Sequence, residues 1–106
     1  MISWAECAGF DWDDGNLNKN REKHGVADAE CEEVFFNRPL VVRHDRTHSS
    51  EEERRWHAPG LTDGERYLLV VFTVRRNLIR VISARPMTSR EWRFYVIYEE
   101  NEGKEA

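Results

Sequence analysis

The sequence predicts an α+β domain with a mostly antiparallel sheet, two helices near the N-terminus and one near the C-terminus. Polar segments with helix-ending signals occupy the first third of the chain, and strand-like runs separated by short turns follow. Because short turns join antiparallel neighbours, these runs favour an antiparallel sheet. No repeat or linker interrupts the 106 residues, so we expect one domain over residues 1–98 and an acidic flexible tail over residues 99–106.

A short strand and two helices are expected first. Residues 9–14, "GFDWDD", alternate in polarity and end in acids, which is typical of a strand that leads into a helix. Residues 14–24 predict a weakly amphipathic helix that ends at Gly25, because glycine readily adopts the left-handed conformation of a helix C-cap. Asp28 is predicted to cap a second helix, "DAECEEVFFN", which stops before Pro39.

Four strands are predicted in the middle of the chain. The first is "PLVVRHD", and a polar loop, "HDRTHSSEEE", separates it from "EERRWHA", which has Glu53, Arg55 and His57 on one side. The run "RYLLVVFTV" is continuously apolar, as expected of a central strand that is covered on both faces. The turn "RRN" leads into the last strand, "NLIRVISAR", so these two strands are expected to form an antiparallel hairpin.

The third helix is predicted from its opening residues, "TSRE". Thr88 and Glu91 form a capping box, in which each side chain accepts a hydrogen bond from the other residue's backbone amide. Trp92, Tyr95 and Val96 then recur at helical spacing, and they predict the apolar face of this helix.

Charge is distributed unevenly along the chain. The net charge is −4, yet residues 1–36 carry a balance of −6, residues 37–98 one of +5 and residues 99–106 one of −3. The cationic residues of the middle part are all arginines, whose planar guanidinium suits phosphate better than the lysine ammonium does. This asymmetry favours a nucleic-acid partner in spite of the acidic total.

The sequence gives no signal for export or membrane insertion. Its start, "MISWAECAGFDWDD", lacks the basic lead and apolar centre of a signal peptide, and no apolar run is long enough to cross a membrane. We therefore expect a cytoplasmic protein without membrane contacts. Cys7 and Cys31 lack a metal-binding spacing, so two reduced thiols, one of them packed, are expected.

Several classes of catalytic site lack support in the sequence. His44 and His48 stand four residues apart, but metal-binding histidines at this spacing need a helix to align them, and these two lie in a predicted loop. The chain has no Gly-x-Ser-x-Gly motif and no glycine-rich phosphate loop. We therefore expect no metal and no other cofactor.

The remaining ionisable groups suit the cleavage of RNA, which supplies its own nucleophile, the 2′-hydroxyl. The reaction needs a base for that hydroxyl, cations for the phosphate and an acid for the leaving oxygen. His24 and Glu53 both stay open as the base. Three strand arginines are predicted to bind the phosphate, because arginine hardly deprotonates: Arg55, Arg80 and Arg85.

Each of these residues also has an ordinary structural role open to it. Lys23 and His24 suit the C-terminal end of a helix, where cations offset the macrodipole. Glu53 and Arg55 suit a cross-strand ion pair. The residue types alone therefore do not separate a catalytic site from solvated structural contacts.

Several motifs stand in a consistent order along the chain: "FDWDDGNLNKNREKHGV", "EEERRW", "GERYLLVVFTVRRNLIRVISAR" and "TSREWRFY". Together they resemble the BrnT family of bacterial type II toxins, ribonucleases of the RelE-like fold, from Phe10 to Tyr95. The resemblance implies an RNA-cleaving toxin, which together with the ionisable residues above predicts a metal-independent endoribonuclease. The implied catalytic residues are Lys23, His24, Glu53, Arg55, Arg80 and Arg85, and the implied RNA contacts are Arg54, Arg90 and Tyr95.

The resemblance also implies a partner, an antitoxin of the BrnA type with a ribbon-helix-helix domain. This antitoxin would neutralise the toxin and supply all DNA contacts when the complex represses its own promoter. The sequence departs from the family at Asn16, where a lysine is frequent, and at Pro86 and Met87, which replace a basic-Ala pair.

Two alternatives remain open alongside the nuclease hypothesis. One is a catalytically weakened toxin-like module that docks an antitoxin and takes part in transcriptional autoregulation. The other is an interaction domain with a basic face and no RNA-cleaving activity. The nuclease hypothesis requires His24 and Glu53 to converge with the three strand arginines on one concave patch.

Overall fold

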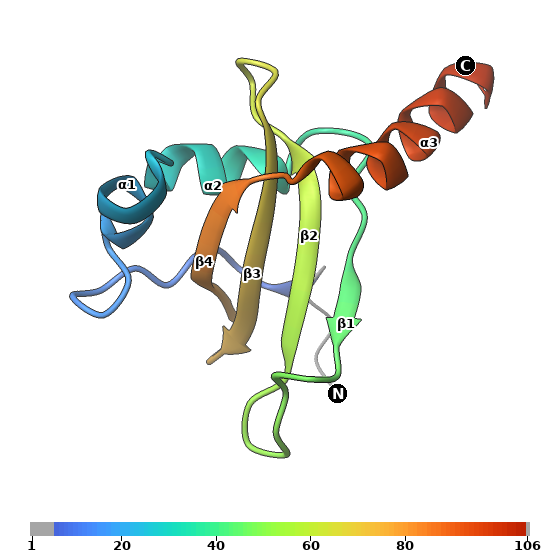
Figure 1. Ribbon diagram of the computed structural model, residues 1–106. Coiled ribbons are helices and arrows are strands. Elements are labelled where there is room, and N and C mark those ends of the chain that lie inside the picture. Colours follow the sequence, from blue (N-terminus) through green and yellow to red (C-terminus); the bar gives the residue numbers. More distant parts are fainter. Residues whose placement is uncertain (1–5, 106) are drawn as a thin grey trace.

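The computed structural model describes residues 6–105, and it describes the side chains up to residue 101 (Figure 1). Its elements in chain order are α1 (Lys19–His24), α2 (Asp28–Val34), β1 (Arg43–Asp45), β2 (Arg55–Leu61), β3 (Tyr67–Arg75), β4 (Leu78–Pro86) and α3 (Ser89–Glu105). The four strands form one antiparallel sheet in the order β1-β2-β3-β4. The predicted α+β class is therefore confirmed, with two helices before the sheet and one after it.

Helices pack on both faces of this sheet (Figure 1). α1 and α2 cover one face, which we call the core face, and α3 crosses one end of the other, which we call the open face. Side chains alternate between the two faces along a strand. Leu68, Val70 and Phe72 of β3 point to the core face, so the residues between them point to the open face.

The centre of the core is β3, as its apolar run predicts. Leu68, Val70 and Phe72 are fully buried, and they belong to one cluster with Val34 of α2. Burial of each such side chain contributes about 1.5–3 kcal/mol. Gly60 of β2 lets α2 approach closely, because a Cβ there would lie 2.7 Å from Val34 Cγ1.

The two cysteines are both free thiols. Cys31 belongs to the core cluster, and its burial raises the pKa of the thiol to about 12. Cys7 is only partly buried. The prediction of two reduced thiols, one of them packed, is therefore confirmed.

The N-terminal segment contains less regular structure than predicted. The expected strand over residues 9–14 is reduced to one parallel bridge between Phe10 and Ile79, at the outer edge of β4. The predicted start of α1 at residue 14 is also wrong. Residues 14–18 form turns that end at Asn18, whose left-handed backbone (φ 59°) delays the helix to Lys19.

α2 begins and ends differently from the prediction. Asp28 is the first helical residue rather than the cap, and its carboxylate accepts a hydrogen bond from the Asn18 amide. The capping position belongs to Ala27, whose amide donates to the Glu30 side chain. The helix ends at Val34, so it is shorter than the predicted segment.

α3 begins as predicted and continues further. The Thr88 amide donates to Glu91 Oε1 (2.8 Å) and the Glu91 amide donates to Thr88 Oγ1 (3.2 Å), which confirms the capping box. Of the predicted apolar face, Tyr95 is buried, whereas Trp92 is 44% exposed. The helix continues to Glu105, and the flexibility of residues 99–106 stays a prediction. Within residues 6–105 no helix has the length and apolar character needed to cross a bilayer.

Candidate functional site

The open face carries a row of polar side chains across its inner strands. Thr73 of β3 pairs with Arg55 of β2 on one side and with Arg80 of β4 on the other. Residues that are directly opposite in an antiparallel sheet share a face, and neighbouring strands lie about 4.8 Å apart, so the two arginine Cα atoms are about 10 Å apart. We call these three residues the arginine row. Both arginines therefore lie on the open face, one on each side of Thr73.

Glu53 holds Arg55 in place. The Glu53 carboxylate accepts hydrogen bonds from Arg55 Nε (3.1 Å) and from Arg75 Nη2 (2.8 Å). The hydrogen bond from Arg75 is the main reason why the pKa of Glu53 is lowered, and the hydrogen bond from Arg55 adds to it. Together they outweigh the partial burial of Glu53, which acts to raise its pKa. A carboxylate with a lowered pKa is a weak proton acceptor, so Glu53 is better suited to position Arg55 than to act as the base.

Arg80 is held by the N-terminal segment. Its Nη2 donates to Asp13 Oδ1 (2.9 Å), and its Nη1 lies 3.4 Å from Asp11 Oδ2. Its side chain is only 12% exposed, and Nη1 has no hydrogen-bond partner among the described residues. The hydrogen bond to Asp13 raises the pKa of Arg80 and lowers that of Asp13. Arg80 is therefore a fixed cation with unused hydrogen-bonding capacity.

Asn16 fixes the same segment against β4. It is buried, and its side-chain amide donates to the carbonyl oxygens of Asp11 and Val81. Its carbonyl oxygen accepts from the Asp13 amide. Asn16 thus helps to place the two carboxylates beside Arg80.

The structure does not bring His24 together with Glu53. Lys23 and His24 are exposed at the end of α1, where Gly25 adopts the left-handed conformation predicted for the C-cap. The Gly25 carbonyl accepts a hydrogen bond from Arg66, just before β3, whereas Glu53 bonds Arg75 at the end of β3.

A strand rises about 3.3 Å per residue, so the Cα atoms of Arg66 and Arg75 are separated by roughly 30 Å. Two side chains at opposite ends of this distance cannot act on one phosphodiester. The five predicted residues are therefore split between the two ends of β3, so the site predicted from the sequence is wrong as a single patch. Glu53, Arg55 and Arg80 remain near one end, and a nuclease site has to be built from that group without His24.

Arg85 lies with the α1 end of the sheet, apart from the arginine row. It pairs with Leu69, four residues before Thr73, so it is about 13 Å along the sheet from the row. Glu91 of α3 accepts two hydrogen bonds from it, at 2.7 and 2.9 Å. Arg90 is exposed on the first turn of α3.

Arg54 and Tyr95 also lie away from the row. Arg54 is exposed, and by strand alternation it is on the face opposite to Arg55. Tyr95 is 1% exposed, and its hydroxyl donates to the carbonyl oxygen of Pro39. Its ring is packed against the open face and is not accessible for stacking on a base.

A cluster that the sequence reasoning missed lies next to the row. Asp45, the last residue of β1, is buried, and its Oδ2 lies 2.9 Å from His48 Nδ1 and 3.0 Å from His57 Nε2. The histidine spacing in "HDRTH" indicates at most a metal site, and no group of three metal-ligating side chains occurs in the described part of the chain. The sequence feature that points to this cluster is the alternation of "EERRWHA", because it places His57 on the same face of the strand as Arg55.

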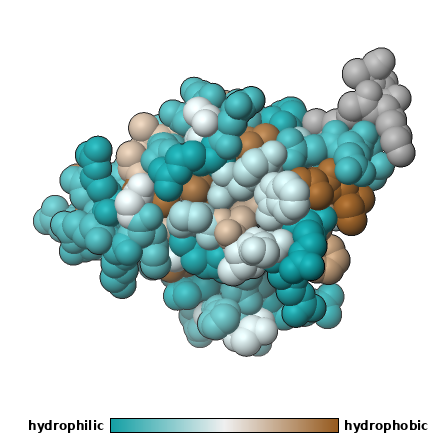
Figure 2. Space-filling model, turned by 45° about the horizontal axis from the view of Figure 1, so that its top comes forward, coloured by the Kyte–Doolittle hydropathy of each residue, from teal (hydrophilic) through white to brown (hydrophobic). Residues whose placement is uncertain are grey.

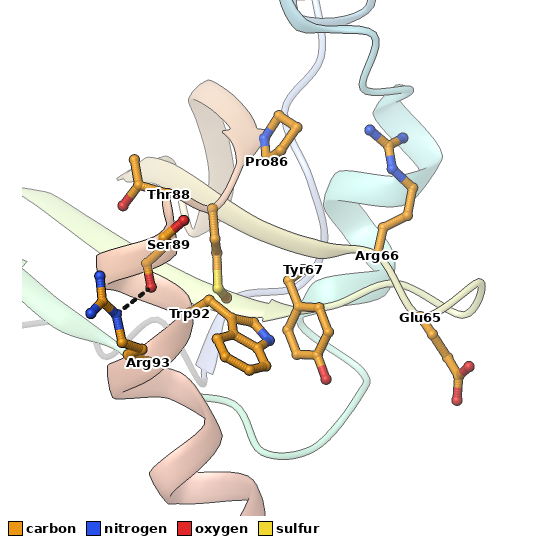
Figure 3. Close-up of a pocket in the computed structure, with 9 residues that line it drawn as sticks. Glu65, Arg66, Tyr67, Pro86, Thr88, Ser89, Trp92 and Arg93 are labelled. Atoms are coloured by element: carbon orange, nitrogen blue, oxygen red, sulfur yellow. Dashed lines mark hydrogen bonds between the residues drawn. The ribbon is translucent and has the colours of Figure 1, made fainter.

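An open cavity lies at the α3 end of the sheet, away from the row. It has a volume of about 690 Å³, and its wall includes Tyr67, Pro86 and Trp92. Figure 3 shows the Trp92 and Tyr67 rings side by side, and their centroids are 6.3 Å apart in an edge-to-face arrangement. Arg93 is held there by a hydrogen bond from its Nε to the Ser89 carbonyl. An accessible aromatic ring beside a cation suits stacking of a base.

The fold and the polar face define a small α+β protein with arginines and carboxylates paired across one face of its sheet. The sequence model of a family described as "Ribonuclease toxin, BrnT, of type II toxin-antitoxin system" matches residues 12–91. This chain therefore belongs to the BrnT family of ribonuclease toxins. No curated protein matches it. Family membership implies an RNA substrate and an antitoxin partner.

Proposed function

We propose that this protein is a metal-independent endoribonuclease that cuts RNA by attack of the 2′-hydroxyl on the adjacent phosphodiester. The arginine row supports this proposal most directly, because Arg55 and Arg80 face the same side of the sheet across Thr73. A scissile phosphate between them would receive two guanidinium groups as negative charge develops on its oxygens. The products would be a 2′,3′-cyclic phosphate and a 5′-hydroxyl.

The residues at the other end of β3 fit a second contact with the same RNA strand. Lys23, His24 and Arg90 are exposed, and Arg85 is partly exposed beside the cavity that Trp92 lines. We assign these side chains to phosphates and bases that lie one or more nucleotides from the scissile bond. Their distance from the row makes them RNA-binding rather than catalytic in this proposal.

The ion pairs of the site support a second candidate function, that of a weakened toxin. Each of the three predicted phosphate-binding arginines already has a carboxylate partner: Glu53 for Arg55, Asp13 for Arg80 and Glu91 for Arg85. An RNA phosphate has to compete with these carboxylates. Growth arrest on expression separates the two functions, because a weakened toxin would be harmless while it still co-purified with an antitoxin.

The proposed partner is an antitoxin of the BrnA type with a ribbon-helix-helix domain, through which alone the complex would contact DNA. α3 offers a surface for it. Phe94, Ile97 and Tyr98 are 56%, 52% and 45% exposed, and Figure 2 shows hydrophobic surface on the α3 side of the molecule. Arg90 and Arg93 flank this strip. A segment of the antitoxin that combines apolar and acidic side chains would complement it.

The docking surface has a direct test. Co-expressed with the antitoxin from the neighbouring reading frame, Phe94→Asp and Ile97→Asp should each reduce co-purification strongly. Arg46→Asp, on an exposed loop away from α3, is the control and should co-purify normally. Full retention of the antitoxin by both α3 variants would remove this surface from the interface. We propose that toxin and antitoxin meet in the cytoplasm, where the RNA substrate is.

The nuclease proposal is tested with purified protein and a defined RNA in the presence of EDTA. Cleavage should persist in chelator, yield a 2′,3′-cyclic phosphate, and stop at a position where the substrate carries a 2′-deoxy sugar. Arg55→Ala and Arg80→Ala should each lower the cleavage rate about 100-fold or more, as loss of an oxyanion-stabilising donor does. Arg46→Ala is the matched control. Loss of cleavage in EDTA with full recovery on adding Mg²⁺ would contradict the metal-independent mechanism.

A further inference from the structure

We propose that His57, oriented by Asp45, is the base that takes the proton from the attacking 2′-hydroxyl. This inference rests on the proposed ribonuclease function and adds a catalytic residue outside the set predicted from the sequence. It starts from a contact between two neighbouring strands. Asp45 of β1 and His57 of β2 both point to the open face, and Asp45 Oδ2 lies 3.0 Å from His57 Nε2.

The ionised state of Asp45 determines which nitrogen of His57 carries the proton. Burial acts to raise the pKa of Asp45, but hydrogen bonds from the His48 amide and from both imidazoles outweigh it and lower the pKa to about 2. The carboxylate therefore stays ionised and accepts a hydrogen bond from Nε2–H of His57. In the neutral ring Nδ1 is then unprotonated, and it has no hydrogen-bond partner among the described residues.

The position of His57 suits transfer of a proton near the arginine row. His57 lies two residues beyond Arg55 on the same face of β2, which is about 7 Å along the strand. The 2′-hydroxyl adjacent to a phosphate held by Arg55 and Arg80 would be within reach of the imidazole. The His57 side chain is 38% exposed, so it is open to a substrate from solvent.

The groups around His57 come from three elements. Besides Asp45 and Arg55, the ring faces Arg43, which is opposite to it on β1. Glu91 and Tyr98 of α3 line a cavity of about 130 Å³ together with His57. His57 thus has two cationic neighbours, Arg43 and Arg55, and two carboxylate neighbours, Asp45 and Glu91. Among the described residues, Asp45 is the group that hydrogen-bonds the imidazole.

The two bases considered from the sequence are less suitable. Glu53 is engaged by Arg55 and Arg75, and its pKa is lowered. His24 is at the opposite end of β3 from the row. His57 is an imidazole on the same face as both arginines, and a second residue fixes its tautomer, as in hydrolases that pair histidine with aspartate.

The proposed step is balanced. The 2′-O–H bond breaks and its proton goes to Nδ1 of His57, while the 2′-oxygen forms a bond to phosphorus. The bond from phosphorus to the 5′-oxygen breaks, and that oxygen takes a proton from water. The imidazolium then returns its proton to solvent, and Asp45 stabilises the transient cation without becoming protonated.

The test compares two histidines on neighbouring strands, of which only His57 bonds Asp45. His57→Ala should lower single-turnover RNA cleavage about 100-fold or more, which is the usual contribution of general base catalysis. His44→Ala is the matched control and should change the rate less than 3-fold, because His44 is exposed on β1 and bonds Ser49 rather than Asp45. Circular dichroism and thermal unfolding should show that both variants keep the fold.

Two further measurements separate catalysis from packing. Free imidazole added to His57→Ala should restore part of the activity, and the rescued rate should follow the fraction of neutral imidazole in solution. Asp45→Asn, a change in the positioning residue, should lower the rate at every pH and alter the acidic limb of the pH–rate profile. A merely structural role of Asp45 would leave the shape of that limb unchanged, which would overturn its assignment.

The outcomes for His57 and for the proposed function are distinguishable. Normal cleavage by His57→Ala, with cleavage abolished in Arg55→Ala and Arg80→Ala, would overturn His57 as the base and leave the ribonuclease proposal intact. Normal cleavage in all three variants would overturn both. Loss of cleavage in His57→Ala without imidazole rescue, together with an equal loss in His44→Ala, would assign both histidines a structural role and overturn His57 as the base.

Discussion

Glu91 accepts two hydrogen bonds from the Arg85 guanidinium, Oε1 from Nη1 at 2.7 Å and Oε2 from Nη2 at 2.9 Å. The same carboxylate accepts a hydrogen bond from the Thr88 amide and so closes the capping box of α3. One side chain thus joins the end of β4 to the start of α3. Arg85 lowers the pKa of Glu91 to about 2, against the effect of its partial burial.

Removal of this carboxylate should destabilise the protein. We expect Glu91→Ala to lower the free energy of unfolding by about 1–2 kcal/mol, because it removes one half of the α3 capping box and leaves Arg85 without its partner. Urea denaturation measures the change. Glu100→Ala, an exposed glutamate further along α3, is the matched control and should lie within about 0.5 kcal/mol of the parent. Equal stabilities of the two variants would contradict the structural role of Glu91.

Acid should weaken the fold in a defined range of pH. Asp45 and Glu91 have folded-state pKa values of about 2, below their ordinary values of 3.8 and 4.5. Each contributes stability that is fully present above its ordinary value and is lost as pH falls through about 2. The free energy of unfolding should therefore decline between about pH 4.5 and 2. In Asp45→Asn and Glu91→Gln this decline should be shallower, and an unchanged slope in both variants would contradict the assignment.

The carboxylates beside Arg80 should limit the affinity for RNA. Asp13→Asn keeps an acceptor for Arg80 but removes one negative charge next to the phosphate site, so RNA should bind about 2–5-fold more tightly in low salt. The gain should shrink as salt is raised, since exposed charges are screened. Asp14→Asn, the exposed neighbour, is the control. Weaker binding by Asp13→Asn would mean that Asp13 positions Arg80 rather than competing with RNA.

A charge in the centre of β3 should unfold the domain. Val70→Asp and Phe72→Asp each place an unpaired carboxylate among fully buried apolar side chains, at a cost of several kcal/mol. Both proteins should lose cooperative unfolding, as followed by circular dichroism. Val71→Asp, on the partly exposed side of the same strand, should be tolerated better. A stable, cooperatively folding Val70→Asp protein would contradict the core described above.

The sequence predicts the fold well where the pattern is local. The apolar run of β3 and the Thr88–Glu91 capping box both depend on neighbouring residues, and both are present in the structure. The strand predicted over residues 9–14 is reduced to a single bridge because turns begin at its end, in which Asp13 accepts a hydrogen bond from the Gly15 amide. Such a side-chain contact competes with strand pairing, and alternation alone does not reveal it.

The site was harder to predict because it depends on register. The local sequence does not reveal that Arg55 and Arg80 are both opposite Thr73. The irregularity between Val71 and Phe72 also shifts the register of β4 against the earlier residues of β3. The same limit explains why Asp45 was missed. Its partner His57 is 12 residues away and becomes its neighbour only through pairing of β1 with β2.

The central claim is that Arg55 and Arg80 bind one scissile phosphate, and a double-mutant cycle on RNA cleavage tests it most directly. Arg55→Ala, Arg80→Ala and the double variant are compared under single-turnover conditions with folded, purified proteins. We predict that each single change costs about 100-fold and that the double change costs far less than their product, because both remove support from the same transition state. Full additivity, or unchanged cleavage in either single variant, would contradict the claim.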